Sequence, residues 1–207
     1  MASDTATRTL AFGPIAVRYD ESVITPRPWT LSQSEWVADV ASVCPPGPIL
    51  ELCSGAGHIG LAAAVLTGRP LVQVDANPSA CELAQVNARD AGRSAVVDVR
   101  CGWLAEMIAP DERFPIVIAD PPYVPSRVVG RFDDPALAID GGRDGLEGLI
   151  ECGGLADRHL VPGGLLSLQV RGPGQWQNLR RHLPDTLRLV ECRSYGTDRA
   201  VVHMTRV

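Results

Sequence analysis

Lysine is absent from this 207-residue sequence, and arginine supplies all 19 of its basic residues. Acidic residues number 24, which gives a formal net charge of −5 at pH 7. Binding to nucleic acid through phosphate contacts alone requires clustered cations. The charge balance therefore argues against broad nucleic-acid binding, although it is compatible with a local basic patch.

The sequence also lacks any pair of cysteines separated by two residues. A zinc site or a dense disulfide framework needs closely spaced ligands or cysteines. The six cysteines are Cys44, Cys53, Cys81, Cys101, Cys152 and Cys192. Most of them lie within apolar runs, so we interpret them as buried free thiols and expect no metal site.

Long apolar runs are missing as well. No run approaches the roughly 20 residues needed to cross a bilayer, and the polar residues 1–9 contain no apolar signal core. We therefore expect a cytoplasmic protein that has no membrane partner.

Strands and helices alternate after residue 48. The predicted strands are 49–52, 71–75, 95–100, 116–120, 165–170, 187–192 and 200–205, the predicted helices are 32–43, 59–67, 79–91, 146–160 and 175–182, and residues 121–145 are predicted to be irregular. Short links between strands and helices imply a parallel α/β sheet that is covered on both faces. Such sheets bind ligands at the carboxyl ends of their strands.

One catalytic domain is predicted for residues 31–207, because 45% of the sequence is apolar and the length suits a single core. Residues 1–30 are predicted to form an N-terminal tail and a hairpin. The hairpin prediction rests on the alternation of apolar and polar residues around Gly13-Pro14.

A glycine-rich loop follows the first strand of the alternating region. Gly55, Gly57 and Gly60 match the pattern G-x-G-x-x-G, and Asp75 ends the next strand, about 20 residues further on. An acid at that position can hold the hydroxyl groups of a ribose. The pattern predicts a binding site for a nucleoside-containing cofactor.

Glu51 indicates which cofactor the loop binds. A pyrophosphate requires bare N–H groups and a helix dipole, and a carboxylate at the end of the same strand would repel it. S-adenosylmethionine carries an ammonium group and a sulfonium, which a carboxylate attracts. The pattern E-x-x-x-G-x-G therefore favours S-adenosylmethionine over NAD.

The segment Asp120-Pro121-Pro122-Tyr123 follows the predicted strand 116–120. Neither proline has an N–H group, so nearby carbonyl groups remain available as acceptors. The Asp120 carboxylate and the Pro121 carbonyl can each accept one hydrogen of a planar –NH2 group, and Tyr123 can pack on a flat group. The segment predicts a site that positions an amino or amide nitrogen for transfer.

These motifs resemble those of class I S-adenosylmethionine-dependent methyltransferases, and in particular the HemK/PrmC family of protein glutamine N5-methyltransferases. The segment VITPRPWT at residues 23–30 is similar to the family's V-L-I-P-R-P-E-T, and AIDGGRDGL at 138–146 is similar to A-L-x-G-G-x-D-G-L. VPGG at 161–164 and GTDRAVV at 196–202 also fit the family. The resemblance covers residues 10–207 and only the family's catalytic domain.

The resemblance implies a Rossmann-like α/β fold with a mostly parallel seven-stranded sheet and an antiparallel C-terminal strand. By position it implies that S-adenosyl-L-methionine, and its product S-adenosyl-L-homocysteine, are bound by Glu51, Cys53, Ser54, Gly55, Gly57, Asp75, Ala76, Gly102, Trp103 and Asp120. It implies that the methyl acceptor is bound by Thr25, Pro26, Arg27, Asp120, Pro121 and Tyr123, and that Asp120, Pro121, Pro122 and Tyr123 form the catalytic segment.

Three departures from the family bear on the acceptor. The family has Asn at the position of Asp120, an acid at the position of Gly102, and an N-terminal helical docking domain that we do not find before residue 10. Asp-Pro-Pro-Tyr is more usual in enzymes that methylate nucleobase amino groups. We expect a protein glutamine as the acceptor, and the alternatives are an adenine N6 or guanine N2 amino group and a small metabolite.

Two rival interpretations belong to other classes of protein. A NAD-dependent oxidoreductase would share the glycine pattern, but Glu51 and the segment 120–123 oppose it. A binding module without catalysis would keep the pocket and bind cofactor without turnover.

Overall fold

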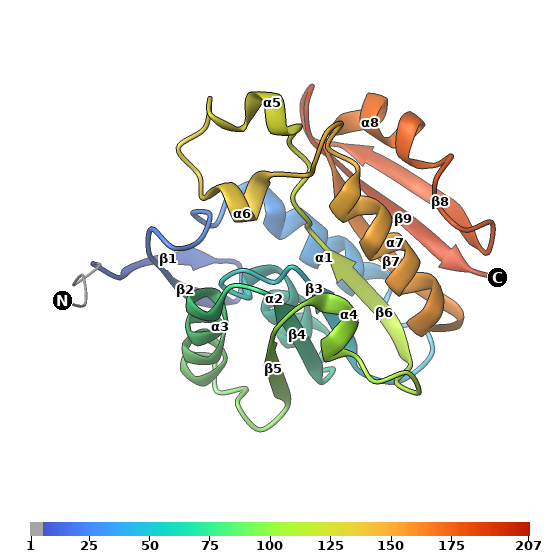
Figure 1. Cartoon of the computed structure of the whole chain (residues 1–207). Helices are drawn as coiled ribbons and strands as arrows, with labels where there is room; N and C mark the ends of the chain where they lie inside the picture. Colours follow the sequence, from blue (N-terminus) through green and yellow to red (C-terminus); the bar gives the residue numbers. More distant parts are fainter. Residues whose placement is uncertain (1–5) are drawn as a thin grey trace.

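A seven-stranded mixed sheet forms the centre of the protein in a computed structural model that describes residues 6–207 (Figure 1). Its strand order is β5-β4-β3-β6-β7-β9-β8. Neighbouring strands from β5 to β7 are parallel, and β9 pairs antiparallel with both β7 and β8. The predicted mostly parallel sheet with an antiparallel C-terminal strand is confirmed.

The elements of the sheet and its cover follow the predicted alternation. The strands of the sheet are β3 (Ile49–Leu52), β4 (Leu71–Asp75), β5 (Val97–Cys101), β6 (Phe114–Ala119), β7 (Leu160–Val170), β8 (Leu187–Ser194) and β9 (Ala200–Arg206). The helices are α1 (Leu31–Val40), α2 (His58–Thr67), α3 (Pro78–Asp90), α4 (Leu104–Met107), α5 (Ser126–Val129), α6 (Ala136–Ile139), α7 (Glu147–His159) and α8 (Gly172–Leu179), with a 3-10 turn η1 (Pro28–Thr30) before α1.

Two predictions of local structure were incomplete. The stretch 121–145, predicted to be irregular, contains the single-turn helices α5 and α6. Strand β7 begins at Leu160, five residues before the predicted start, because Leu160 already pairs with Phe114 of β6. The Pro-Gly-Gly sequence at 162–164 therefore lies within the strand and does not precede it.

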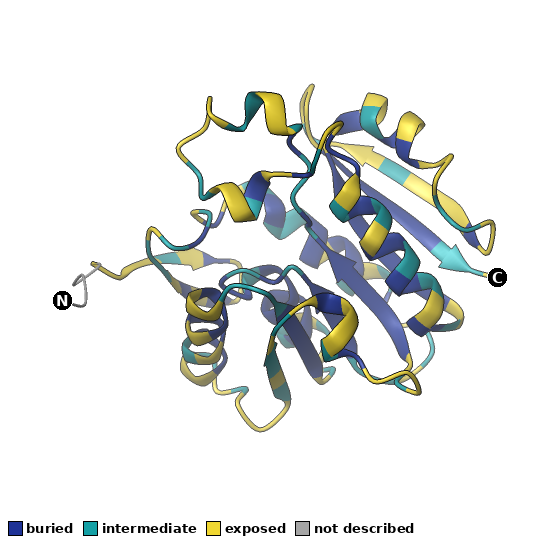
Figure 2. Ribbon diagram, viewed as in Figure 1, coloured by how far each residue is buried: buried dark blue, intermediate teal, exposed yellow. Residues whose placement is uncertain are grey.

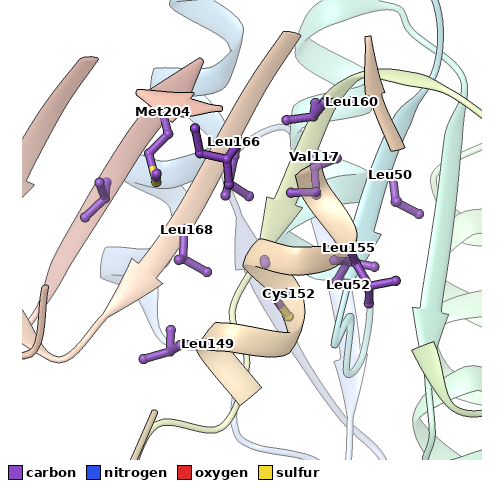
Figure 3. Close-up of a cluster of buried hydrophobic side chains, with 14 of the residues drawn as sticks. Leu50, Leu52, Val117, Leu149, Cys152, Leu155, Leu160, Leu166, Leu168 and Met204 are labelled. Atoms are coloured by element: carbon purple, nitrogen blue, oxygen red, sulfur yellow. The ribbon is translucent and has the colours of Figure 1, made fainter. Parts of the chain in front are cut away.

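The sheet separates two clusters of buried apolar side chains. Figure 2 shows that the central strands are mostly buried, whereas the helices that cover them carry many exposed residues. One cluster lies between the sheet and helices α4, α7 and α8, and Figure 3 shows part of it, including Leu149, Cys152 and Leu155 of α7. The other cluster lies between the sheet and helices α1, α2 and α3. Because both faces are covered, strands such as β3 are buried along their whole length.

An N-terminal hairpin packs against the second cluster. It consists of β1 (Arg8–Phe12) and β2 (Ile15–Tyr19), which are antiparallel. Asn87 of α3 fastens the hairpin, because its side chain accepts from the Arg18 N–H and donates to the Arg18 and Ala56 carbonyls. Part of the predicted tail, residues 1–5, lies outside the described residues.

Arg69 joins the amino ends of the strands to the preceding helix. Its guanidinium donates to four carbonyl oxygens, those of Ala41, Cys44, Pro45 and Gly47, at 2.7–3.2 Å. These carbonyls belong to the end of α1 and to the turn that leads into β3. One side chain therefore satisfies four backbone carbonyl groups between α1 and β3.

No helix in residues 6–207 is long and apolar enough to cross a membrane.

Candidate functional site

Three neighbouring strands bring the predicted site residues to one edge of the sheet. Strand β3 lies between β4 and β6, and all three are parallel. The glycine loop after β3, Asp75 at the end of β4 and Asp120 directly after β6 therefore lie at the same edge. This is the edge at which the alternation predicts a ligand site.

Three of the five residues in the loop between β3 and α2 have a left-handed backbone conformation. Cys53, Gly55 and Gly57 have φ angles of 56°, 53° and 77°. A non-glycine residue rarely adopts such an angle, so Cys53 adds strain to the loop. Gly55 has open space where a side chain would stand, with no atom within 4 Å of an added Cβ. The loop thus exposes backbone to whatever lies above it.

Asp75 holds the loop in place. One of its carboxylate oxygens accepts from the Gly55 N–H at 2.7 Å, and the other accepts from the Asn77 N–H at 2.8 Å. Burial raises the pKa of this carboxyl group, and the backbone N–H groups of Asn77, Gly55 and Ala76 oppose the rise. Asp75 is half-buried, so it also remains open toward the edge of the sheet.

Glu51 lies beneath the loop and is only 2% exposed. Its carboxylate accepts from the Gly60 N–H at 2.7 Å and from the Gln73 side-chain nitrogen at 2.6 Å. A Cβ at Gly60 would collide with this carboxylate, so the third glycine of the motif makes room for the glutamate. Burial is the main cause that raises the pKa of Glu51 to about 7.

Asp120 follows β6 at the same edge. Burial raises its pKa to about 7, and the positive charge of Arg27 opposes the rise. Arg27 is itself paired with Asp134, at 2.8 Å between Nη2 and Oδ2. The charge of Arg27, a predicted acceptor residue, thus lowers the pKa of Asp120, although the two residues are distant in sequence.

Tyr123 is fixed at both its backbone and its phenol group. Its carbonyl accepts from the Gln175 side chain at 3.0 Å, and its hydroxyl oxygen accepts from the Gln169 side chain at 3.3 Å. Burial is the main cause that raises the pKa of its phenol to about 12. The segment that contains Pro121 and Pro122 thus ends on a firmly held aromatic ring.

The glycine-rich segment after Asp140 packs directly against this turn. A Cβ on Gly141 would lie 2.8 Å from the Pro122 carbonyl oxygen, and one on Gly145 would collide with the Tyr123 carbonyl. The Gly141 N–H also donates to the Val124 carbonyl at 2.8 Å. Only glycine permits so close an approach of two backbones.

The remaining predicted residues lie around this core. The Gly102 N–H donates to the Asp75 carbonyl at 2.9 Å, which places Trp103 next to the end of β4, with 64% of its surface exposed. Thr25 is exposed and Pro26 is buried in the segment that precedes η1. In residues 6–207 no cluster of His, Cys, Asp and Glu could hold a metal ion.

The electrostatics of the edge fit a positively charged ligand. The charges of Asp75 and Asp120 both raise the pKa of Glu51, so three carboxyl groups lie close together. A cation among them would favour the ionised form of each. The buried Ser54 hydroxyl has no hydrogen-bond partner in the described part of the chain, which leaves a polar contact for a ligand. The residues present therefore suit S-adenosylmethionine, which is cationic and polar.

Sequence reasoning missed the glutamines that support the site. Gln73 holds Glu51, while Gln169 and Gln175 hold Tyr123. No motif contains them, and Gln73 and Gln169 occupy strands that read as ordinary buried segments. A polar residue inside a buried strand was the one available signal.

Solved structures with the same architecture come from methyltransferases. A ribosomal protein L11 methylase from Lactobacillus delbrueckii subsp. bulgaricus aligns with a TM-score of 0.66 at 15% identity, covering 90% of this chain and 83% of that one. An RNA methyltransferase from Salinibacter ruber, in complex with S-adenosyl-L-homocysteine, aligns with a TM-score of 0.55 at 24% identity, covering 89% and 94%. The protein has the Rossmann-like class I methyltransferase fold.

Curated relatives narrow this class. The release factor glutamine methyltransferase of Gloeobacter violaceus is 32% identical over 178 residues, which is 81% of this chain and 62% of that protein. The corresponding protein of Thermosynechococcus vestitus is 34% identical over 164 residues, which is 72% and 54%. No family model matches the chain. The predicted resemblance to the HemK/PrmC glutamine methyltransferases is confirmed, and the chain spans little more than half the length of these relatives.

Proposed function

We propose that this protein is an S-adenosylmethionine-dependent methyltransferase that methylates a side-chain amide nitrogen of a protein glutamine. The observation that carries the proposal is the position of Asp120-Pro121-Pro122-Tyr123 beside the carboxyl cluster at one edge of the sheet. The names of the similar curated proteins support the choice of glutamine.

The methyl donor supplies a methyl group on positively charged sulfur. The loop residues Cys53, Ser54, Gly55 and Gly57 would contact it through backbone groups and the unpartnered Ser54 hydroxyl. Glu51, Asp75 and Asp120 would balance its charge, and Ala76, Gly102 and Trp103 would border it beyond the end of β4.

The acceptor nitrogen would be held by the other half of the site. The Asp120 carboxylate and the Pro121 carbonyl would each accept one hydrogen of the –NH2 group, and Pro122 would keep the turn rigid. The nitrogen loses one proton when it is methylated. Asp120, whose pKa of about 7 results from burial, is placed to accept it.

Thr25, Pro26 and Arg27 complete the acceptor side in this proposal. Arg27 lies close enough to Asp120 and to Tyr123 for its charge to affect both. It would keep Asp120 ionised when the acceptor approaches.

The test is transfer of radiolabelled methyl groups from S-adenosylmethionine to a purified bacterial release factor. We expect label in the protein, and loss of the label when the acceptor glutamine is replaced by glutamate. The same assay in a cell lysate separates the alternatives, because label in RNA or DNA would identify a nucleobase acceptor and label in the small-molecule fraction would identify a metabolite. Either of these results would overturn the proposed acceptor.

A further inference from the structure

Gln169 lies next to Asp120 at the same edge of the sheet. Strands β6 and β7 are parallel, and Ala119 is paired with Leu168, so the residues that follow them are neighbours. Side chains alternate between the two faces of a sheet, so Gln169 and Asp120 lie on the same face. Gln169 is only 2% exposed.

Burial of a polar side chain is unfavourable unless its polar atoms form hydrogen bonds, and only one side of the Gln169 amide does so. The Gln169 nitrogen donates to the Tyr123 hydroxyl oxygen at 3.3 Å. Its own side-chain oxygen is buried and has no partner among the residues that the structure describes. A buried polar atom without a partner marks a place that a ligand or a water molecule completes.

The bond from Gln169 also decides where the phenol hydrogen of Tyr123 can go. A hydroxyl group carries one hydrogen and accepts through its lone pairs. Because Gln169 donates to the oxygen, the hydrogen must point elsewhere, and within residues 6–207 the Tyr123 hydroxyl makes no hydrogen bond besides the one from Gln169. The backbone of Tyr123 is fixed as well, because the Gln175 side chain donates to its carbonyl oxygen.

We propose that Gln169 is a positioning residue that makes the site specific for a primary carboxamide, by directing the Tyr123 hydroxyl hydrogen to the carbonyl oxygen of the acceptor. The inference rests on the proposed function. A carboxamide offers two N–H donors and one carbonyl acceptor. Asp120 and the Pro121 carbonyl take the donors, and Tyr123 supplies the donor that the carbonyl needs. A simple amine has no such acceptor and gains nothing from Tyr123.

The test compares five variants with the wild type, namely Q169L, Q169E, Q177L, Y123F and Q169L/Y123F, and uses a purified release factor as the acceptor. Q169L removes the amide. Q169E keeps the shape but replaces the donor by a carboxylate, which would attract the phenol hydrogen to itself. Q177L is the matched control, since it removes the same group from an exposed position of α8. Acceptor Kd is measured by calorimetry with S-adenosyl-L-homocysteine bound, and kcat and KM are measured by methyl transfer.

We expect Q169L and Q169E to weaken acceptor binding about tenfold, the usual effect of one lost hydrogen bond. Cofactor Kd should stay within about twofold of the wild-type value, and Q177L should match the wild type. The double variant Q169L/Y123F should bind the acceptor with the same Kd as Y123F alone, because both changes remove the same contact.

An unchanged acceptor Kd in Q169L, with wild-type enzyme active on the same release factor, would refute the positioning role and leave the proposed function standing. An additive loss in the double variant would refute it as well. A wild-type enzyme that methylates no release factor would instead refute the proposed function.

Discussion

The charge of Asp120 depends on neighbours that the structure brings together from distant parts of the sequence. Burial disfavours its ionised form, and Arg27 favours it. Arg27 is shared with Asp134, so part of its charge is already balanced. A carboxyl group balanced in this way can change its protonation state near neutral pH, which suits the proton-accepting role that we propose for Asp120.

Replacement of Asp120 by alanine separates acceptor chemistry from cofactor binding. We expect D120A to lower kcat by at least about 100-fold, because the positioning of the nitrogen is lost. Affinity for S-adenosyl-L-homocysteine, which lacks the sulfonium charge that Asp120 would balance, should stay within about threefold, since Glu51 and Asp75 remain. Calorimetric titration with S-adenosyl-L-homocysteine and a methyl-transfer assay measure the two effects. A large loss of affinity for S-adenosyl-L-homocysteine would contradict the acceptor role assigned to Asp120, and D98A, at an exposed position of β5, is the control.

The carboxyl cluster predicts how stability depends on pH. Glu51 and Asp120 have a folded-state pKa of about 7, above the ordinary values of 4.5 and 3.8. Between these values the folded protein binds more protons than the unfolded chain. Stability is therefore fully present below the unfolded pKa and is lost as pH rises through the folded pKa.

Without cofactor, we expect the free energy of unfolding to fall by about 1 kcal/mol for each group between pH 6 and pH 8. The E51Q variant should lose its share of this dependence, because an amide does not titrate. Urea unfolding at the two pH values measures the difference, with D98N as a control. Equal pH dependence in E51Q and wild type would show that Glu51 is not the titrating group.

At the level of secondary structure, the sequence predicts what is local. The strand, glycine loop and helix from Ile49 to Thr67 follow from a short apolar run and from three glycines at a recognisable spacing. The single-turn helices α5 and α6 could not be predicted, because four residues are too few to show helical periodicity. Nor does any local pattern reveal that Gln169 meets Tyr123, since 46 residues separate them.

The close approach of the glycine segment after Asp140 to the turn at 120–123 gives a prediction for two glycines. Gly145 has φ +80°, and an added Cβ would collide with the Tyr123 carbonyl, while Gly163 has φ +73° and open space. We expect G163A to cost about 1 kcal/mol from backbone strain alone. G145A should cost more and should raise KM for the acceptor, because Tyr123 must move. Urea unfolding and acceptor kinetics test this, and equal effects of the two changes would contradict it.

For the whole molecule, alternation predicts a parallel sheet but not the order of its strands. The order β4-β3-β6 puts Asp75 and Asp120 on either side of the loop after β3, and this arrangement creates the site. The order depends on pairings between segments that are distant in sequence, such as β3 with β6, which no single segment encodes. The division at residues 30 and 31 into a hairpin and one catalytic domain stays a prediction.

Cofactor binding should be visible in the thermal stability of the whole protein. A ligand at 100 times its Kd stabilises the folded state by about 2.7 kcal/mol. For a chain of this size we expect S-adenosyl-L-homocysteine to raise Tm by about 5–10 °C. NAD at the same concentration should not raise it, because Glu51 repels a pyrophosphate. Differential scanning fluorimetry measures both, and a shift with NAD alone would favour the oxidoreductase interpretation.

At the opposite edge of the sheet, Arg69 forms hydrogen bonds to backbone carbonyl groups. The planar fork of a guanidinium carries five N–H donors, so that it reaches several oxygens at once. The four backbone contacts of Arg69 involve no carboxyl group, in contrast to the acids at the far edge of the sheet. A change of pH is thus expected to act on the proposed ligand site and to leave the Arg69 contacts at the opposite edge unchanged. Because the sequence contains no lysine, arginine is the basic side chain available for such contacts.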